Sequence, residues 1–134
     1  MESKLHLKIT THEKVVFDED VDEIYSKGTH GEFGILPGHI PFMTALDIGI
    51  TKIVTNGTVK KFTTMGGIFQ LADNEATILT QASESADEID IQRAEEAKKR
   101  AQERLENETD NLDIQRAQMA LAKSFARLKA TKND

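Results

Sequence analysis

The chain has 134 residues, with 17 Lys and Arg against 23 Asp and Glu, a formal net charge of −6, and no Cys or Trp. A chain of this length forms about one domain around one core. Without Cys, disulfides, thiolate-bound zinc and cysteine nucleophiles are excluded. The acidic balance argues against general nucleic-acid binding, which needs Lys and Arg to neutralise phosphates. No apolar run approaches the ~20 residues that cross a bilayer.

The composition divides the chain into two parts. All eight Gly and both Pro lie within residues 1–67, whereas nine of the thirteen Ala lie after residue 85. Residues 1–86 carry 7 basic and 12 acidic groups (net −5), and residues 87–134 carry 10 and 11 (net −1). We therefore predict a β domain over residues 1–84, followed by a helical arm over residues 85–134.

The first part reads as a series of short strands. Residues 5–10 alternate apolar and polar side chains, as a half-buried strand does. Asn56-Gly57 is the pair typical of a type I′ hairpin turn. Gly66-Gly67 is expected to start a further strand, and Asp73-Asn74 to turn the chain after it. Turn signals about every eight to twelve residues predict an antiparallel β-sandwich or flattened barrel.

The second part reads as two helices. Ser85-Ala86-Asp87-Glu88 has the S-x-x-E form of a capping box, which predicts a helix start. A polar break at residues 107–111 precedes the second helix, for which Thr109, Asp110 and Asn111 are candidate N-caps. The two predicted apolar stripes are Ile91, Ala94, Ala97, Ala101 and Leu105, then Ile114, Ala117, Leu121, Phe125 and Leu128. This pattern indicates an antiparallel hairpin whose Ala-rich seam buries little area, and hence a candidate moving part.

A short repeat lies within the helical part. I-D-I-Q-R-A at 89–94 recurs as L-D-I-Q-R-A at 112–117. Each Asp is expected in the first helical turn, with an Arg three residues later on the same surface. From the residues alone, the favoured interpretation is that each copy is simply the N-terminal turn of a helix.

The residues that could carry chemistry form no catalytic or metal-binding pattern. The four His, His6, His12, His30 and His39, have no metal-ligand spacing, and no nucleophile motif or phosphate-binding glycine loop is present. The acidic run at residues 18–20 is interpreted as a solvated strand edge rather than a cation site. We therefore expect neither a catalytic residue nor a bound metal.

Residues 27–41, K-G-T-H-G-E-F-G-I-L-P-G-H-I-P, are predicted to form a long shaped loop with a brief apolar run at 33–36. The apolar residues that follow, Ile40 to Met43, suit either a partner interface or the core, and the residues alone leave both readings open.

Three motifs resemble the epsilon subunit family of the rotary F-type ATP synthase. They are G-E-F-G-I-L-P-G-H-I-P at 31–41, M-G-G-I-F at 65–69 and I-D-I-Q-R-A at 89–94. They occur in the family's order, and the similarity extends over essentially the whole chain. The resemblance implies about ten strands in a sandwich, followed by a two-helix hairpin.

The resemblance also implies a role. The chain would be a non-catalytic central-stalk subunit of a proton-translocating synthase at the cytoplasmic face of a bacterial membrane, coupling c-ring rotation through gamma. The expected gamma and c-ring interface comprises Gly31, Glu32, Phe33, Gly34, Ile35, Leu36, Pro37, Gly38, His39, Ile40 and Pro41.

The resemblance further implies that the hairpin regulates ATP hydrolysis. Extended along gamma, it would restrain ATP hydrolysis, with Lys123, Arg127 and Lys129 meeting an acidic segment of beta in the alpha and beta assembly. The alternative is that these three cations form a solvated basic face.

Folded, the hairpin would bind regulatory ATP, with no other cofactor required. The implied nucleotide contacts are Glu84, Ile89, Asp90, Arg93, Ala94, Arg100 and Arg127. Lys123 stands where some nucleotide-binding members have Arg, which replaces a two-pronged donor with a point charge. The alternatives are that the motif only caps a helix, or that the chain is a stand-alone ATP sensor using Asp90 and Arg93.

Overall fold

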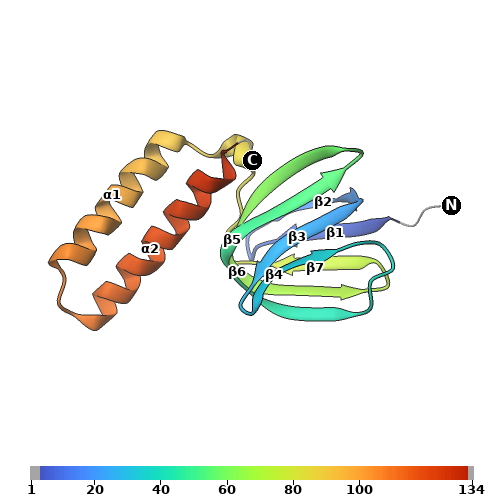
Figure 1. The fold of residues 1–134 in the computed structure, drawn as a ribbon, viewed down its shortest axis with the longest axis horizontal. Coiled ribbons are helices and arrows are strands. Elements are labelled where there is room, and N and C mark those ends of the chain that lie inside the picture. The colour runs from blue at the N-terminus through green and yellow to red at the C-terminus, as the bar shows by residue number, and fades with distance from the viewer. Residues whose placement is uncertain (1–3, 133–134) are drawn as a thin grey trace.

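The computed structural model describes residues 4–132, as a sheet folded into two layers with a helical hairpin against one side (Figure 1). The strands are β1 (Leu5–Thr10), β2 (Val15–Val21), β3 (Glu23–Gly28), β4 (Gly31–Ile35), β5 (Phe42–Thr55), β6 (Thr58–Ala72) and β7 (Glu75–Leu79). A 3-10 turn, η1 (Ala86–Glu88), leads to α1 (Ile91–Asn107) and α2 (Asn111–Ala130). The predicted class, a β-sandwich followed by a two-helix hairpin, is confirmed.

The strand order is β2-β1-β7-β6-β5-β3-β4. Every pairing is antiparallel except that of β1 with β7, which is parallel. Hairpins join β5 to β6 and β6 to β7. β7 in contrast pairs with β1, the strand farthest from it in the sequence of the β part. The pairing of the first strand with the last therefore brings one parallel pair into an otherwise antiparallel sandwich.

The described residues form seven strands, and the expected number of about ten is wrong. β5 and β6 have 14 and 15 residues and stay paired from Phe42↔Leu71 to Thr55↔Thr58 without a change of register. Gly66-Gly67, which was expected to begin a strand, instead lies inside β6. Both glycines have positive φ (76° and 117°), so they bend the strand rather than interrupt it. Each long strand consequently serves both layers.

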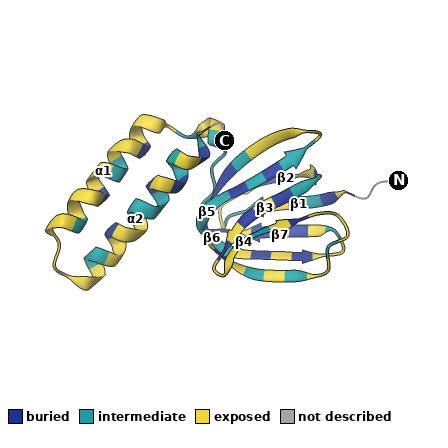
Figure 2. Cartoon of the chain, viewed as in Figure 1, coloured by how far each residue is buried: buried dark blue, intermediate teal, exposed yellow. Residues whose placement is uncertain are grey.

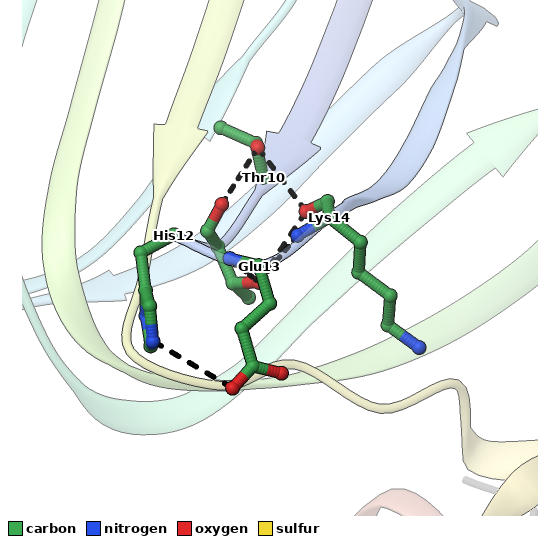
Figure 3. A network of polar contacts seen from close by, with 5 residues as sticks. Thr10, His12, Glu13 and Lys14 are labelled. Carbon is green, nitrogen blue, oxygen red and sulfur yellow. Dashed lines mark hydrogen bonds and ion pairs between the residues drawn. The ribbon is translucent and has the colours of Figure 1, made fainter.

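The turns are largely those that the sequence indicates. Asn56 and Gly57 have φ of 50° and 79°, the positive values that a type I′ turn requires. The β1–β2 turn is held by hydroxyls: Thr10 Oγ1 donates to the Lys14 carbonyl over 3.2 Å, and the Lys14 amide donates to Thr11 Oγ1 over 3.3 Å. Figure 3 shows this cluster, with His12 facing Glu13 outside it. The turn thus satisfies its own backbone groups.

The hydrophobic core belongs to the sandwich alone. Its buried cluster draws on all seven strands and ends at Ile78. Phe69 is fully buried at its centre, with the ring of Phe33 5.1 Å away, centroid to centroid. Figure 2 shows the contrast between the buried positions of the strands and the largely exposed helices. The sandwich therefore has a core that does not depend on the hairpin.

The first helix begins later than the capping-box pattern predicts. Ser85 makes no side-chain cap, and η1 ends at Ile89 in extended backbone. α1 starts at Ile91, where the Asp90 carboxylate accepts the backbone N–H of Arg93 over 3.0 Å. Ser85 instead pairs with Phe62 on β6, because the segment still follows the sheet. Of the three candidate caps for α2, Asp110 is the one used, accepting from the Leu112 amide over 2.8 Å.

The buried residues of the hairpin are all small. Its buried positions are Ala94 and Ala101 on α1 and Ala117, Ser124, Ala126 and Ala130 on α2. The larger members of the predicted stripes are only half-buried or, like Ile91 and Phe125, about half exposed (53% and 48%). Small residues let the helix backbones approach closely but bury little apolar area, so the hairpin is weakly held.

Candidate functional site

The distinctive segment at 31–41 is half strand and half turn, not the loop predicted. Residues 31–35 form β4, which pairs with β3 from Gly28↔Gly31 to Ile24↔Ile35 through a two-residue turn at Thr29-His30. Residues 36–41 then form the true turn, where the His39 amide donates to the Leu36 carbonyl. A strand forms because the apolar positions Phe33 and Ile35 alternate with Glu32 and Gly34, so that one face joins the core.

The apolar residues of this segment divide between core and surface. Ile35 is buried, and Phe33 and Phe42 lie against Phe69 of the core. Leu36 and Ile40, in contrast, are 54% and 74% exposed. The segment is therefore anchored at one side and exposes large apolar side chains at the other, and the partner interface stays a prediction for the exposed ones.

A second apolar surface was missed by the sequence analysis. Ala45 of β5, Ile68 of β6 and Leu79 of β7 are aligned by register in one row, and all three are exposed. Met43, two residues from Ala45 on the same side of β5, is 64% exposed. The sequence does indicate this surface, because these strands carry apolar residues at successive positions, which face opposite sides of the sheet. An exposed apolar row of this kind is typical of a contact surface.

The two copies of the D-I-Q-R-A repeat lie at different places on their helices. In the first, Asp90 is the N-cap of α1, and it is bonded to the backbone rather than the side chain of Arg93. In the second, Asp113 lies within the first turn of α2, 3.7 Å from Arg116. Among residues 4–132 only the second copy forms the predicted ion pair. The two copies of the repeated sequence therefore do not adopt the same local structure.

Of the predicted nucleotide contacts, Glu84 and Arg127 are brought together. Arg127 Nε lies 2.6 Å from Glu84 Oε1, with side chains 30% and 37% exposed. Glu84 is held in place by β6: its carbonyl accepts the Thr63 amide over 2.9 Å, and its amide donates to Thr63 Oγ1 over 3.0 Å. This pair links the helical arm to the sandwich.

The other predicted contacts are dispersed. Arg93 and Arg100 are exposed, Ala94 is buried in the seam, and Ile89 borders a cavity of about 490 Å³ between the start of β6, η1 and the end of α2. Lys123 is half-buried and Lys129 exposed on α2. The folded arrangement thus presents one formed ion pair and two unengaged arginines, not an enclosed nucleotide pocket.

A larger groove lies between the sandwich and α2. It measures about 700 Å³ and is bordered by β3, β4, β5 and β6 on one side and α2 on the other. Lysines from both sides reach it, and the sequence analysis did not find it. The groove exists because α2 crosses the outer face of β5 and β6, a placement that no local pattern encodes.

An unusual charged cluster lies on the opposite edge of the sandwich. His6 Nδ1 is 2.8 Å from Asp20 Oδ1, and its Nε2 is 2.5 Å from Asp18 Oδ1. The hydrogen bond to Asp20, and then that to Asp18, raises the pKa of His6 above its usual 6.5. Asp18 and Asp20 thus lie on either side of the His6 ring, an arrangement that we call the His6 bracket. Within residues 4–132, no group of three or more His, Asp or Glu is arranged to hold a metal.

Comparison with known proteins assigns the family. The model of the ATP synthase delta/epsilon chain β-sandwich domain matches residues 4–86, and that of its long α-helix domain matches residues 87–132. The chain is 43% identical over 133 residues to the ATP synthase epsilon chain of Nitratidesulfovibrio vulgaris (strain DP4), covering 99% of each. It is 50% identical over 124 residues to the ATP synthase epsilon chain of Pelotomaculum thermopropionicum, covering 92% of each.

Two solved structures share the fold. A chain of the Euglena gracilis mitochondrial ATP synthase, OSCP/F1/c-ring in rotational state 1, aligns with a TM-score of 0.85 and 22% identity, over 98% of this chain and 84% of that one. A chain of the Tetrahymena thermophila mitochondrial ATP synthase, central stalk and c-ring, aligns with a TM-score of 0.70 and 19% identity, over 98% of both. The fold and the two family models agree: this chain belongs to the ATP synthase delta/epsilon chain family.

Proposed function

We propose that this chain is the central-stalk epsilon subunit of a proton-translocating ATP synthase, at the cytoplasmic face of a bacterial membrane. The observation that carries the proposal is the match of both family domains across residues 4–132, with epsilon chains as relatives over nearly the full length. Epsilon chains are non-catalytic stalk subunits, and the chain acts by contact rather than chemistry. No helix within residues 4–132 is long and apolar enough to span a bilayer.

Gamma and the c-ring are the proposed partners of the sandwich. The Euglena and Tetrahymena structures contain a c-ring, and their chains share this fold. On this chain, Leu36 and Ile40 of the 31–41 segment and the Ala45–Ile68–Leu79 row offer apolar side chains to a partner. Burial of large exposed apolar side chains would supply the association energy.

The hairpin is proposed to restrain ATP hydrolysis by leaving the sandwich. Its interior is formed by Ala and Ser, and α2 rather than α1 packs on the sheet. A weakly docked element can be shifted between two states by ligands that favour one of them. In the released state Lys123, Arg127 and Lys129 would be available for an acidic segment of the beta subunit.

Two measurements on the assembled complex test this role. Tagged full-length chain should copurify with alpha, beta and gamma, and persistent absence of gamma would refute the assignment. A chain ending at Glu88 should still assemble, because the core cluster ends at Ile78, and ATP hydrolysis should rise. A full-length Lys123→Gln, Lys129→Gln variant should raise hydrolysis without loss of the hairpin. Unchanged hydrolysis in both would show that the hairpin does not restrain this enzyme.

ATP binding to the folded hairpin is the second part of the proposal. It is favoured by the Glu84–Arg127 contact, which places two implied ligands of the nucleotide side by side. ATP at a hundred times its Kd would stabilise the folded state by about 2.7 kcal/mol, enough to bias a weakly docked element.

Calorimetry on the isolated chain tests ATP binding. Asp90→Asn keeps a helix cap but removes the charge, whereas Asp90→Ala removes both, so the pair separates capping from binding. Arg93→Ala should weaken ATP binding, and Arg116→Ala, the matching arginine of the second repeat, should leave it unchanged. Absence of heat below several millimolar ATP would eliminate the nucleotide site. ATP binding without copurification of gamma would favour the stand-alone sensor instead.

A further inference from the structure

The outer face of the sheet carries opposed lysines beneath α2. Register aligns Tyr25 of β3 with Lys52 of β5, and Lys52 with Lys61 of β6. Like charges directly opposite one another on antiparallel strands are destabilising. Lys52 Nζ lies 5.8 Å from the centroid of the Tyr25 ring, which offers it only a weak partner. The fold therefore retains an unfavourable pair at this position.

These lysines open into the groove of about 700 Å³ between the sheet and α2. Lys27, Lys52 and Lys61 reach it from the sheet, and Lys129 reaches it from α2. Two glycines let side chains of β3 lie across the sheet surface: a Cβ on Gly34 would lie 2.7 Å from the Tyr25 ring, and one on Gly49 would lie 3.1 Å from the stem of Lys27. The groove is thus a shaped feature with cations on two separate elements.

The positive charge in the groove is largely uncompensated. Lys27 faces Asp47 at 3.8 Å, and Lys61 Nζ donates to the Lys132 carbonyl over 2.8 Å. Within residues 4–132, no carboxylate lies within 4.0 Å of the ammonium groups of Lys52, Lys61 or Lys129. Among residues 4–132, Glu32 is the one acidic residue that borders the groove. In a chain with a net charge of −6, three such cations around one groove stand out as an anion site.

We propose that this groove binds the polyphosphate chain of an anion, either inorganic or that of a nucleotide. Ammonium groups bind phosphate as point charges. A chain of several phosphates offers several anionic groups to cations that come from two elements. None of Glu84, Asp90, Arg93 or Arg127 borders the groove, so this site is separate from the one proposed above. Because the ligand would contact both the sheet and α2, binding would hold the hairpin on the sandwich.

The test is calorimetry on the full-length chain at low ionic strength, with sodium tripolyphosphate and ATP as separate probes. Lys52→Gln and Lys129→Gln should each weaken tripolyphosphate binding about tenfold, the loss of one charge-assisted contact. Lys14→Gln, in the distant β1–β2 turn, should leave it unchanged. Saturating tripolyphosphate should raise Tm in the wild type and less so in Lys52→Gln. Without ligand, Lys52→Gln should melt no lower than the wild type, because it removes a like-charge pair.

The outcomes separate the two sites. ATP binding that is weakened by Lys52→Gln identifies a nucleotide as a source, and tripolyphosphate binding alone identifies an inorganic chain; either supports the groove. Tripolyphosphate binding that is lost in Arg93→Ala but kept in Lys52→Gln overturns it, as does the absence of binding at low salt. Copurification with gamma, which tests the proposed function, does not depend on these results.

Discussion

Arg127 of α2 bonds to Glu84, the residue that β6 holds through Thr63, with 2.6 Å between Arg127 Nε and Glu84 Oε1. A second hydrogen bond between the two parts runs from Lys61 Nζ to the Lys132 carbonyl, and the buried residues of α2 are Ala and Ser. The pair is therefore one of the polar contacts that hold α2 against the sandwich.

We predict that Glu84→Gln loosens α2 more than it destabilises the sandwich. The pair is about a third exposed, so its loss should cost only about 0.5–1 kcal/mol, and amide exchange in α2 should quicken about two- to fivefold. Hydrogen exchange followed by mass spectrometry measures this. Asp113→Asn breaks the more exposed ion pair to Arg116 within α2 and is the matched control. Equal acceleration in both variants would mean that the Glu84–Arg127 contact does not hold the hairpin.

Phe69→Ala should destabilise the sandwich by about 3–5 kcal/mol, because it leaves a cavity at a fully buried position among Phe33 and Phe42. Urea unfolding at constant m-value gives this number. Phe125→Ala removes the same side chain from the half-exposed surface of α2 and should cost less than about 1 kcal/mol. Similar losses for both would contradict a core confined to the sandwich.

Gly67→Ala should prevent stable folding, whereas Gly57→Ala should be tolerated. Both glycines have positive φ, 117° and 79°, which costs an alanine about 1–2 kcal/mol. Only at Gly67 would the added Cβ also meet backbone, 1.9 Å from the Leu79 carbonyl oxygen, while no atom lies within 4 Å at Gly57. Measurement of the soluble yield and the Tm of the two variants tests this prediction. A well-folded Gly67→Ala protein would show that β6 can bend in another way.

Stability should fall as pH rises past neutrality, through His6. The Asp20 and Asp18 hydrogen bonds raise its folded pKa above the 6.5 of the unfolded chain, so the protonated ring contributes stability. That contribution is complete below pH 6.5 and is lost as pH rises through the raised folded pKa. Tm measured from pH 6 to 9 should show this loss, and His6→Gln should remove it.

A control isolates the bracket from other titrating groups. His30→Gln, on the exposed turn between β3 and β4, should retain the wild-type pH dependence of Tm. Asp20→Asn should reduce it, because the largest cause of the raised pKa is gone. A pH profile that is the same in wild type and His6→Gln would show that the bracket contributes nothing to stability.

Sequence alone determined the features that depend on neighbouring residues. The Asn56-Gly57 turn was predictable because its backbone requires residues that tolerate positive φ, and β1 because its apolar residues recur with period two. The hairpin was predictable because the segment is Ala-rich, periodic and free of Gly and Pro. The same Ala residues predicted that its buried positions would be small. The motifs at 31–41, 65–69 and 89–94 indicated the family that the comparisons then showed.

Tertiary structure decided what depends on residues far apart in the chain. Capping by Asp90 rather than Ser85 follows because Ser85 is still paired with Phe62, 23 positions earlier. Gly66-Gly67 bends β6 instead of beginning a strand because β5 remains in register with it on both sides. The His6 bracket, the Glu84–Arg127 pair and the lysine groove each join separate elements. Local propensities do not encode such contacts; the packing of whole elements does, because it alone sets which distant side chains meet.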